Sequence, residues 1–172
     1  KSIRMIYVAA GDTINRMKIK GVDRFIELVS RNSEDQFILI GPSKDALDWI
    51  NGFRLKNIEV IPQIERGALK EYYNRSQYIG LFSRFEAFGM VILEGMCNGC
   101  IPLVLKTNGS AEILEKPNAP GKIFDLFDCE TISSFVKLNE STSENQIAIQ
   151  KYVRHHFPID ARAKELSTLY NQ

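Results

Sequence analysis

The stretch Ser83–Val104, SRFEAFGMVILEGMCNGCIPLV, decides how the chain folds. It reads as a polar loop, a buried helix over residues 89–97, a glycine turn, and the start of a buried strand at 101–105. The helix carries one carboxylate, Glu94, and its neighbours are apolar. Burying a carboxylate costs several kcal/mol unless a partner hydrogen-bonds or pairs with it. We therefore expect the Glu94 carboxylate to have a partner that hydrogen-bonds to it or pairs with its charge.

The same alternation of buried helix and buried strand extends through the whole chain. Short apolar runs predict strands at residues 3–10, 36–40, 58–61, 78–82, 101–105 and 122–124. Helical patterns lie at 21–30, 44–50, 66–74, 89–97 and 110–115, and two closing helices are expected near 140–154 and 159–170. Strands that are apolar throughout are typical of a parallel sheet covered by helices on both faces. The order predicts an α/β fold, a Rossmann-like doubly wound parallel sheet of about six strands.

Length and composition limit the class of protein. The chain has 172 residues, which suits one domain with a sizeable core. It is 44% hydrophobic and 25% charged, with a formal net charge of +1. That balance gives no electrostatic case for binding nucleic acid or an acidic membrane surface. The chain begins at Lys1 rather than at a methionine, and a core strand is expected almost at once, so we expect a piece of a longer protein.

The three cysteines favour a reducing compartment. Their number is odd and no secretory signal is visible, so we expect a cytoplasmic protein, either free or at the cytoplasmic face of a membrane. Cys97 and Cys100 have CxxC spacing, but a zinc site needs a second pair or histidines at ligand spacing. We interpret them as two small buried residues at a helix end, and we expect no metal site.

Ligands of such folds bind outside the carboxyl ends of the strands. Five loops lie there in this sequence, at residues 9–20, 41–43, 62–66, 83–89 and 106–110. The fourth contains Glu86 and ends at Phe88-Gly89, where a helix begins and free backbone N–H groups favour an anion or an electron-rich oxygen. The fifth, Thr107-Asn108-Gly109-Ser110, is a second glycine turn into a helix and offers the same type of site.

These residues resemble a known signature. Glu86-Ala87-Phe88-Gly89, followed by Glu94-Gly95-Met96-Cys97 and Gly99 to Pro102, resembles the E-x7-E motif of the retaining glycosyltransferases of family 4. Gly109 and Glu112 are similar to the family's next glycine turn and glutamate. Upstream, Ser83 matches a serine before the first glutamate, and Lys20-Gly21-Val22-Asp23 resembles the family's K-G-x-D.

The resemblance implies one half of a GT-B enzyme. Residues 1–172 would form a single C-terminal domain that binds a nucleoside diphosphate sugar and includes the closing helices, and the N-terminal acceptor domain would be absent. With that domain, the enzyme would transfer a hexosyl-type group with retention of configuration to a glycan or lipid-linked sugar, as in polysaccharide biosynthesis. The isolated domain would be inactive.

Roles for single residues follow from the same resemblance. Glu86 and Lys20 would be the catalytic residues: Glu86 would contact the donor sugar near the reacting centre, and Lys20 would offset the diphosphate charge. Glu94 would bind the donor by accepting hydrogen bonds from the ribose. The other implied donor-binding residues are Phe88, Gly89, Met90, Arg16, Gly109 and Ser110. Arg16 departs from the pattern, because the family's arginine directly follows the first strand. No cofactor or metal would be needed, since lysine and arginine supply the positive charge.

Several alternatives remain open on sequence grounds. A structural ion pair with Lys106 or Arg84 would also explain a carboxylate at Glu94. Glu86 would also fit an ordinary loop residue whose side chain is solvated. Two glutamates are also typical of glycoside hydrolases. A non-catalytic nucleotide-sugar-binding module or a GT-B nucleotide-sugar isomerase would keep the fold and donor site without the transfer.

Overall fold

Six parallel strands form the centre of the molecule. The computed structural model describes residues 1–106, 109–139 and 142–158. The strands are β1 (Ile3–Gly11), β2 (Phe37–Pro42), β3 (Ile58–Ile61), β4 (Ser76–Leu81), β5 (Ile101–Leu105) and β6 (Lys122–Phe124). They pair in the order β3-β2-β1-β4-β5-β6, and every pairing is parallel. The predicted six-stranded, doubly wound sheet is confirmed.

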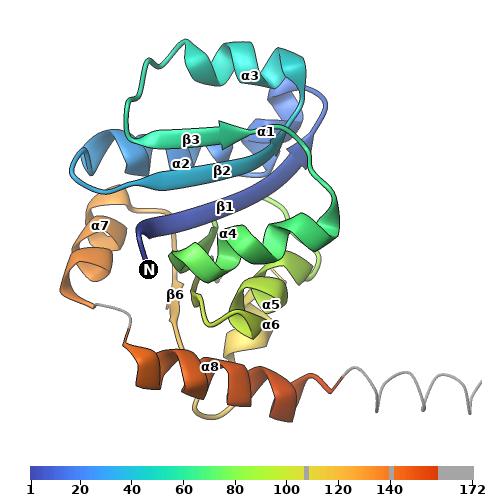
Figure 1. Ribbon diagram of the computed structural model, residues 1–172, viewed down its shortest axis with the longest axis vertical. Helices are drawn as coiled ribbons and strands as arrows, with labels where there is room; N and C mark the ends of the chain where they lie inside the picture. The colour runs from blue at the N-terminus through green and yellow to red at the C-terminus, as the bar shows by residue number, and fades with distance from the viewer. Residues whose placement is uncertain (107–108, 140–141, 159–172) are drawn as a thin grey trace, which may run out of the picture.

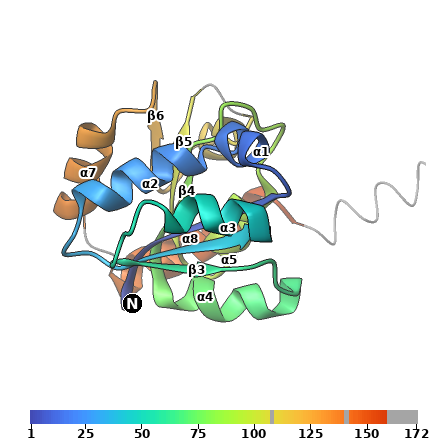
Figure 2. The ribbon, with the colours of Figure 1, turned by 90° about the horizontal axis from the view of Figure 1, so that it is seen from above.

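Helices cover both faces of this sheet (Figures 1 and 2). They are α1 (Ile14–Ile19), α2 (Val22–Arg31), α3 (Lys44–Asn51), the 3-10 turn η1 (Arg66–Ala68), α4 (Leu69–Arg75), α5 (Met90–Cys97), α6 (Ala111–Leu114), α7 (Cys129–Leu138) and α8 (Ser143–His156). On one face α2 packs against α1 and α7, and on the other α5 packs against α4 and α8. Every residue of β2 and β5 is buried, as expected for strands covered on both sides.

Two helices were absent from the sequence prediction. Helix α1 occupies part of the expected loop 9–20, and it begins at Thr13, whose side chain accepts a hydrogen bond from the Arg16 N–H. Helix α7 follows Asp128, which accepts from the backbone N–H groups of Glu130 and Thr131. Both starts use the N-cap geometry that threonine and aspartate favour. The helix predicted at 159–170 lies outside the described residues.

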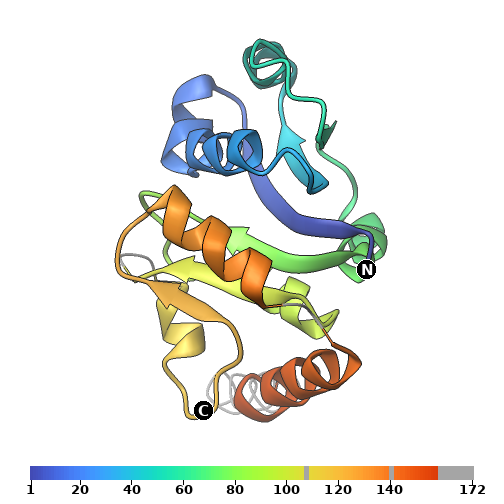
Figure 3. The same ribbon diagram turned by 90° about the vertical axis from the view of Figure 1, so that its left-hand side faces the viewer.

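The strand order reverses direction between β1 and β4. From β1 the chain winds outward to β2 and β3, then returns to β4 beside β1 and continues to β5 and β6. Figure 3 shows the consequence, with the first half of the chain stacked above the second. In open α/β sheets, ligands bind outside the carboxyl ends of the strands at such a reversal. Here that point lies between the loops that follow β1 and β4.

Among the described residues, no helix is both long enough and apolar enough to span a membrane.

Candidate functional site

The loop that carries Lys20 is fastened to the end of β4. The Tyr7 hydroxyl, on β1, donates a hydrogen bond to the Lys20 carbonyl at 2.7 Å and accepts one from the Phe82 N–H at 2.8 Å. The Ser83 hydroxyl donates to the same Lys20 carbonyl at 3.2 Å. Tyr7 is fully buried, and burial raises its pKa well above the ordinary value, so it stays a neutral phenol that both donates and accepts.

An ion pair makes a second connection between the two loops. Arg84 donates to both carboxylate oxygens of Asp23, at 2.8 and 2.7 Å, and its backbone N–H donates to the Ile19 carbonyl at 2.7 Å. Burial pushes the pKa of Asp23 upward, but the hydrogen bonds and charge of Arg84, together with hydrogen bonds from the backbone of Asp23 and Arg24, hold the pKa below its usual value. Asp23 of the K-G-x-D segment therefore connects the start of α2 to the loop that follows β4.

Between these connections, Lys20 and Glu86 form an ion pair. The Lys20 Nζ lies 2.9 Å from the Glu86 Oε2. The Glu86 side chain is 17% exposed and the Lys20 side chain 37%, so both remain within reach of a ligand from solvent. The two residues are 66 positions apart in the chain, and the fold places them together at the strand reversal. This is the pair that the sequence predicted to be catalytic.

The fifth loop packs tightly against the fourth. The Gly109 N–H donates to the Glu86 carbonyl at 2.9 Å, and a Cβ at Gly109 would lie 1.8 Å from the Ala87 carbonyl oxygen. Gly89 begins α5 in the left-handed region, with φ +81°, and a Cβ there would lie 2.9 Å from the Ser110 Cβ. Only glycine permits this approach. The glycines at 89 and 109 thus bring two helix starts beside Glu86.

Three other predicted residues line the same region. The Ser110 hydroxyl is buried and has no hydrogen-bond partner among the described residues. Met90 is half exposed at the first position of α5, and Phe88 is half-buried with its ring against that of Phe157. The backbone N–H groups of a first helical turn have no partner within the helix. The start of α5 therefore offers backbone donors and apolar surface together.

Glu94 differs from its sequence interpretation in one respect. It is partly exposed rather than enclosed by apolar neighbours, and its Oε2 accepts a hydrogen bond from the Tyr73 hydroxyl at 3.2 Å. It lies four positions after Met90, which places the two side chains on one face of α5. The two cations named as alternative partners of Glu94 pair elsewhere in the described part of the chain, Arg84 with Asp23 and Lys106 with Asp125 at 3.4 Å.

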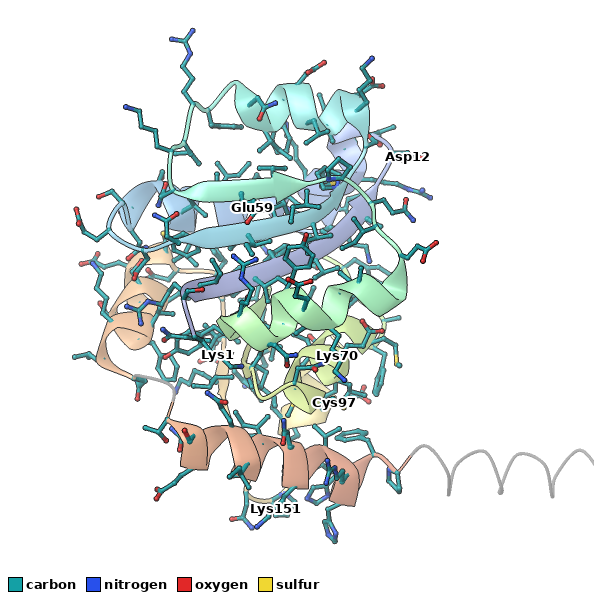
Figure 4. The ribbon with its side chains drawn as sticks, viewed as in Figure 1. Lys1, Asp12, Glu59, Lys70, Cys97 and Lys151 are labelled. Atoms are coloured by element: carbon teal, nitrogen blue, oxygen red, sulfur yellow. The ribbon has the colours of Figure 1, made fainter. Side chains whose placement is uncertain are left out.

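Arg16 is the predicted residue least engaged with the others. Its side chain is 68% exposed and lies 3.5 Å from the carboxylate of Asp12, its neighbour one turn earlier. Figure 4 labels Asp12 where the chain leaves β1, at the edge of the molecule. Arg16 lies on α1 and precedes Lys20, the residue that caps the end of this helix, by four positions. The Lys20 N–H donates to the Arg16 carbonyl at 2.9 Å. A helical spacing of four puts both cations on the same side of α1.

The two cysteines of the CxxC segment lie in different environments. Cys100 is buried, its thiol donates to the Tyr73 and Ser76 carbonyls, and burial raises its pKa to about 12. Cys97 is exposed at the end of α5 (Figure 4), so its predicted burial is wrong. In the part of the chain that the structure describes, no group of three or more histidine, cysteine, aspartate or glutamate side chains could hold a metal ion.

Sequence reasoning missed the supporting residues Tyr7 and Arg84. Tyr7 looks like one more apolar strand residue, and only its burial at the end of β1 shows that its hydroxyl connects two loops. Arg84 lies between Ser83 and Glu86 in the quoted stretch, and its positive charge was the one sequence feature that could have indicated an ion pair there. Its true partner, Asp23, is distant in sequence and could not be chosen without the fold.

The Asp23–Arg84 pair predicts a pH-dependent contribution to stability. Because the folded-state pKa of Asp23 lies below the ordinary 3.8, the contribution is full above about pH 4 and is lost as the pH falls through the folded value. We expect Asp23→Asn to lower the free energy of unfolding at pH 7 by about 1 kcal/mol, or the Tm by about 2–4 °C. Thermal unfolding followed by circular dichroism at pH 7 and pH 3 measures this.

The matched control is Asp12→Asn, which removes the exposed carboxylate paired with Arg16 at 3.5 Å and should leave the Tm unchanged. A Tm difference between wild type and Asp23→Asn that is as large at pH 3 as at pH 7 would contradict the assignment.

Solved structures share this fold. A glycosyltransferase from Rickettsia africae superposes with a TM-score of 0.79 at 16% identity, over 99% of this chain and 48% of that one. Anabaena Alr3699/HepE, in complex with UDP and glucose, superposes with a TM-score of 0.78 at 15% identity, over 99% and 49%. The fold is therefore that of about half of a GT-B glycosyltransferase.

Curated relatives are similar along most of the chain. Glycogen synthase of Aquifex aeolicus is 23% identical over 162 residues, which is 89% of this chain and 35% of that enzyme. Glycogen synthase of Francisella tularensis is 27% identical over 173 residues, or 88% and 35%. The chain thus spans about a third of the length of these relatives.

The family itself is shown by its model. The model of the glycosyl transferases group 1 matches residues 13–155, which include both glutamates and the Lys20 loop. The chain belongs to the glycosyl transferases group 1 and is a glycosyltransferase domain. The glycoside hydrolase alternative is therefore wrong.

Proposed function

We propose that this chain binds a nucleoside diphosphate sugar and forms the C-terminal, donor half of a retaining, family 4-like hexosyltransferase. The observation that carries the proposal is the Lys20–Glu86 pair, which lies at the strand reversal and beside the start of α5. Cationic and anionic side chains are needed together there, because the donor has a diphosphate on one side of its reacting carbon and sugar hydroxyls on the other. The structurally similar Anabaena Alr3699/HepE has been solved in complex with UDP and glucose and in complex with UDP-glucose, which supports this class of ligand.

Each residue would act on a different part of the donor. Lys20, together with Arg16 on the same side of α1, would stabilise the negative charge that develops on the diphosphate as the bond to the sugar breaks. Glu86 would accept hydrogen bonds from sugar hydroxyls and orient the reacting carbon. The backbone amides of Phe88, Gly89 and Met90, at and just before the start of α5, would donate to sugar or phosphate oxygens.

Two further groups would complete the site. Glu94 would accept hydrogen bonds from two ribose hydroxyls, as charge-assisted bonds. The buried Ser110 hydroxyl and the Gly109 turn would lie against the diphosphate, where a polar group without a partner gains one on binding. The acceptor, a glycan or lipid-linked sugar, would bind on an N-terminal domain of the full-length enzyme, working in the cytoplasm or at the cytoplasmic face of a membrane.

The first test is direct binding without metal. Because Lys20 and helix N–H groups supply the positive potential, we expect a nucleoside diphosphate to bind with the same Kd, within about twofold, in excess EDTA and in Mg²⁺. Isothermal titration with UDP, GDP and ADP, each with and without EDTA, measures this and identifies the base. A strict requirement for added divalent metal would contradict the proposed charge assignment.

A second test concerns transfer. We expect residues 1–172 to bind the donor but to transfer no sugar, because holding donor and acceptor together supplies a large part of the rate enhancement. Release of nucleoside diphosphate from the donor, in the presence of glycan acceptors, is the measurement. Turnover by this chain alone would overturn the two-domain assignment. Binding without transfer in the full-length protein would support a non-catalytic module instead.

A further inference from the structure

Without a ligand, the site's lysine and its glutamate neutralise each other. The 2.9 Å separation between Lys20 Nζ and Glu86 Oε2 is that of a direct, charge-assisted hydrogen bond. A diphosphate that binds Lys20 must therefore either displace the Glu86 carboxylate or lie beside it. Both are anionic, and like charges a few ångströms apart repel strongly where the side chains are partly shielded from water. Glu86 is the more shielded of the pair, with 17% of its side chain exposed.

The pair is not needed to hold the two loops together. The Lys20 carbonyl is fixed by the hydroxyls of Tyr7 and Ser83, and the Glu86 carbonyl by the Gly109 N–H. Arg84 and Asp23 join the same two loops a few residues away. The Glu86 carboxylate can therefore move between Lys20 and a ligand while both backbones stay in place.

We propose that Glu86 makes the site discriminate between the nucleotide sugar and the nucleoside diphosphate that remains after transfer. This inference rests on the proposed function. With a sugar present, the carboxylate leaves Lys20 and accepts hydrogen bonds from sugar hydroxyls, so the diphosphate gains the lysine. The bare diphosphate has no sugar hydroxyl that could replace Lys20 as the partner of the Glu86 carboxylate. The carboxylate therefore stays beside the phosphates and weakens their binding.

The difference in charge between the two ligands also favours binding of the nucleotide sugar over the nucleoside diphosphate. The terminal phosphate of a nucleoside diphosphate has an additional ionisable oxygen, with a pKa of about 6, which in the nucleotide sugar is esterified. The product is therefore the more negative ligand at pH 7. A carboxylate beside the terminal phosphate repels the product more than the donor, which promotes product release.

Glu86→Gln tests the proposal because it keeps the shape of the side chain and removes the charge. We expect the variant to bind UDP about fivefold or more tightly than wild type and UDP-glucose about fivefold or more weakly. The ratio of the two Kd values should shift by about tenfold or more. If wild type prefers another base, the same comparison uses GDP with GDP-mannose or ADP with ADP-glucose. Unchanged or weaker binding of the diphosphate by Glu86→Gln would overturn the proposal.

Two further variants test whether the effect of Glu86→Gln is specific to the charge at this position. Asp125→Asn removes another carboxylate, the one paired with Lys106 just beyond β6, and should change both Kd values less than twofold. A change like that of Glu86→Gln would mean that only the net charge matters and would overturn the proposal. Glu86→Asp keeps the charge, so it should not tighten UDP binding as Gln does, and tightening equal to that of Gln would count against the inference.

A measurement on wild type covers the case in which Glu86→Gln does not fold. The side-chain carboxyl ¹³C resonance of Glu86 should shift on adding UDP-glucose and shift much less on adding UDP. Equal shifts with both ligands would overturn the proposal. If wild type binds neither ligand, the proposed function fails and this inference fails with it, whereas binding of both with no change of ratio in Glu86→Gln removes this inference alone.

Discussion

Glu94→Gln should lower the affinity for the nucleoside diphosphate about ten- to a hundredfold while the fold persists. Two ribose hydroxyls that donate to one carboxylate form charge-assisted bonds, and losing them costs roughly 1.5–3 kcal/mol of binding free energy. The Gln variant retains a side-chain oxygen that can accept the hydrogen bond from Tyr73, which lies 3.2 Å away in wild type. We therefore expect its Tm to stay within about 2 °C of wild type.

The measurement pairs isothermal titration with thermal unfolding of the same variant. Tyr73→Phe is the matched control, because it removes a donor from Glu94 and leaves the carboxylate intact, and it should weaken nucleotide binding less than about threefold. The 2′-deoxynucleotide should bind wild type less well and bind Glu94→Gln little differently from the ribonucleotide. A Gln variant with intact nucleotide affinity and a lowered Tm would mean that Glu94 has a structural role.

The sheet could be predicted because its strands are apolar on both faces. In β2 and β5 every residue is buried, and such runs differ from the polar loops around them in any sequence window. The predicted strands at 58–61, 101–105 and 122–124 have the observed bounds of β3, β5 and β6. Because strands and helices alternate, these runs also predicted the parallel topology, and the strand order confirms the doubly wound fold.

The two missed helices are short or weakly amphipathic. Helix α1 has six residues and one fully buried anchor, Met17, which gives no periodic apolar pattern to detect. Helix α7 buries Ile132 and Val136, one turn apart, but its exposed face holds serines and a threonine that also suit loops. In each case the N-cap residue, Thr13 or Asp128, was the usable signal.

The sequence predicted which residues come together in the candidate site better than it predicted the contacts between them. Motif positions placed Lys20, Glu86 and Gly109 near one another, and the structure brings these three together. No sequence pattern gave the Lys20–Glu86 ion pair, because an ion pair depends on side-chain geometry between two loops that are distant in sequence. Arg16 was predicted to bind phosphate because it is an arginine close to Lys20 in sequence. In the structure its side chain pairs with Asp12 instead of with another residue of the site.

Gly21→Ala should strongly destabilise the fold. Gly21 has φ +75°, a left-handed conformation that costs an alanine about 1–2 kcal/mol. Its Cβ would also lie 2.3 Å from the Phe82 carbonyl oxygen and 2.9 Å from the Tyr7 hydroxyl. The first of these atoms belongs to backbone and cannot rotate away, so overpacking adds about 1–3 kcal/mol. Together they predict a loss of about 3 kcal/mol, or about 6–12 °C in Tm.

The same substitution should also weaken nucleotide binding. Gly21 follows Lys20 directly, and a loop pushed away from Phe82 would lose the Tyr7 and Ser83 hydrogen bonds that fix the Lys20 carbonyl. Thermal unfolding and titration with the nucleoside diphosphate measure the two effects on one sample. Gly67→Ala is the control, because a Cβ there meets nothing within 4 Å and should leave both quantities unchanged. If Gly21→Ala matched that control in Tm, the close approach of Gly21 to the Phe82 backbone, just after β4, could not be what holds the Lys20 loop in place.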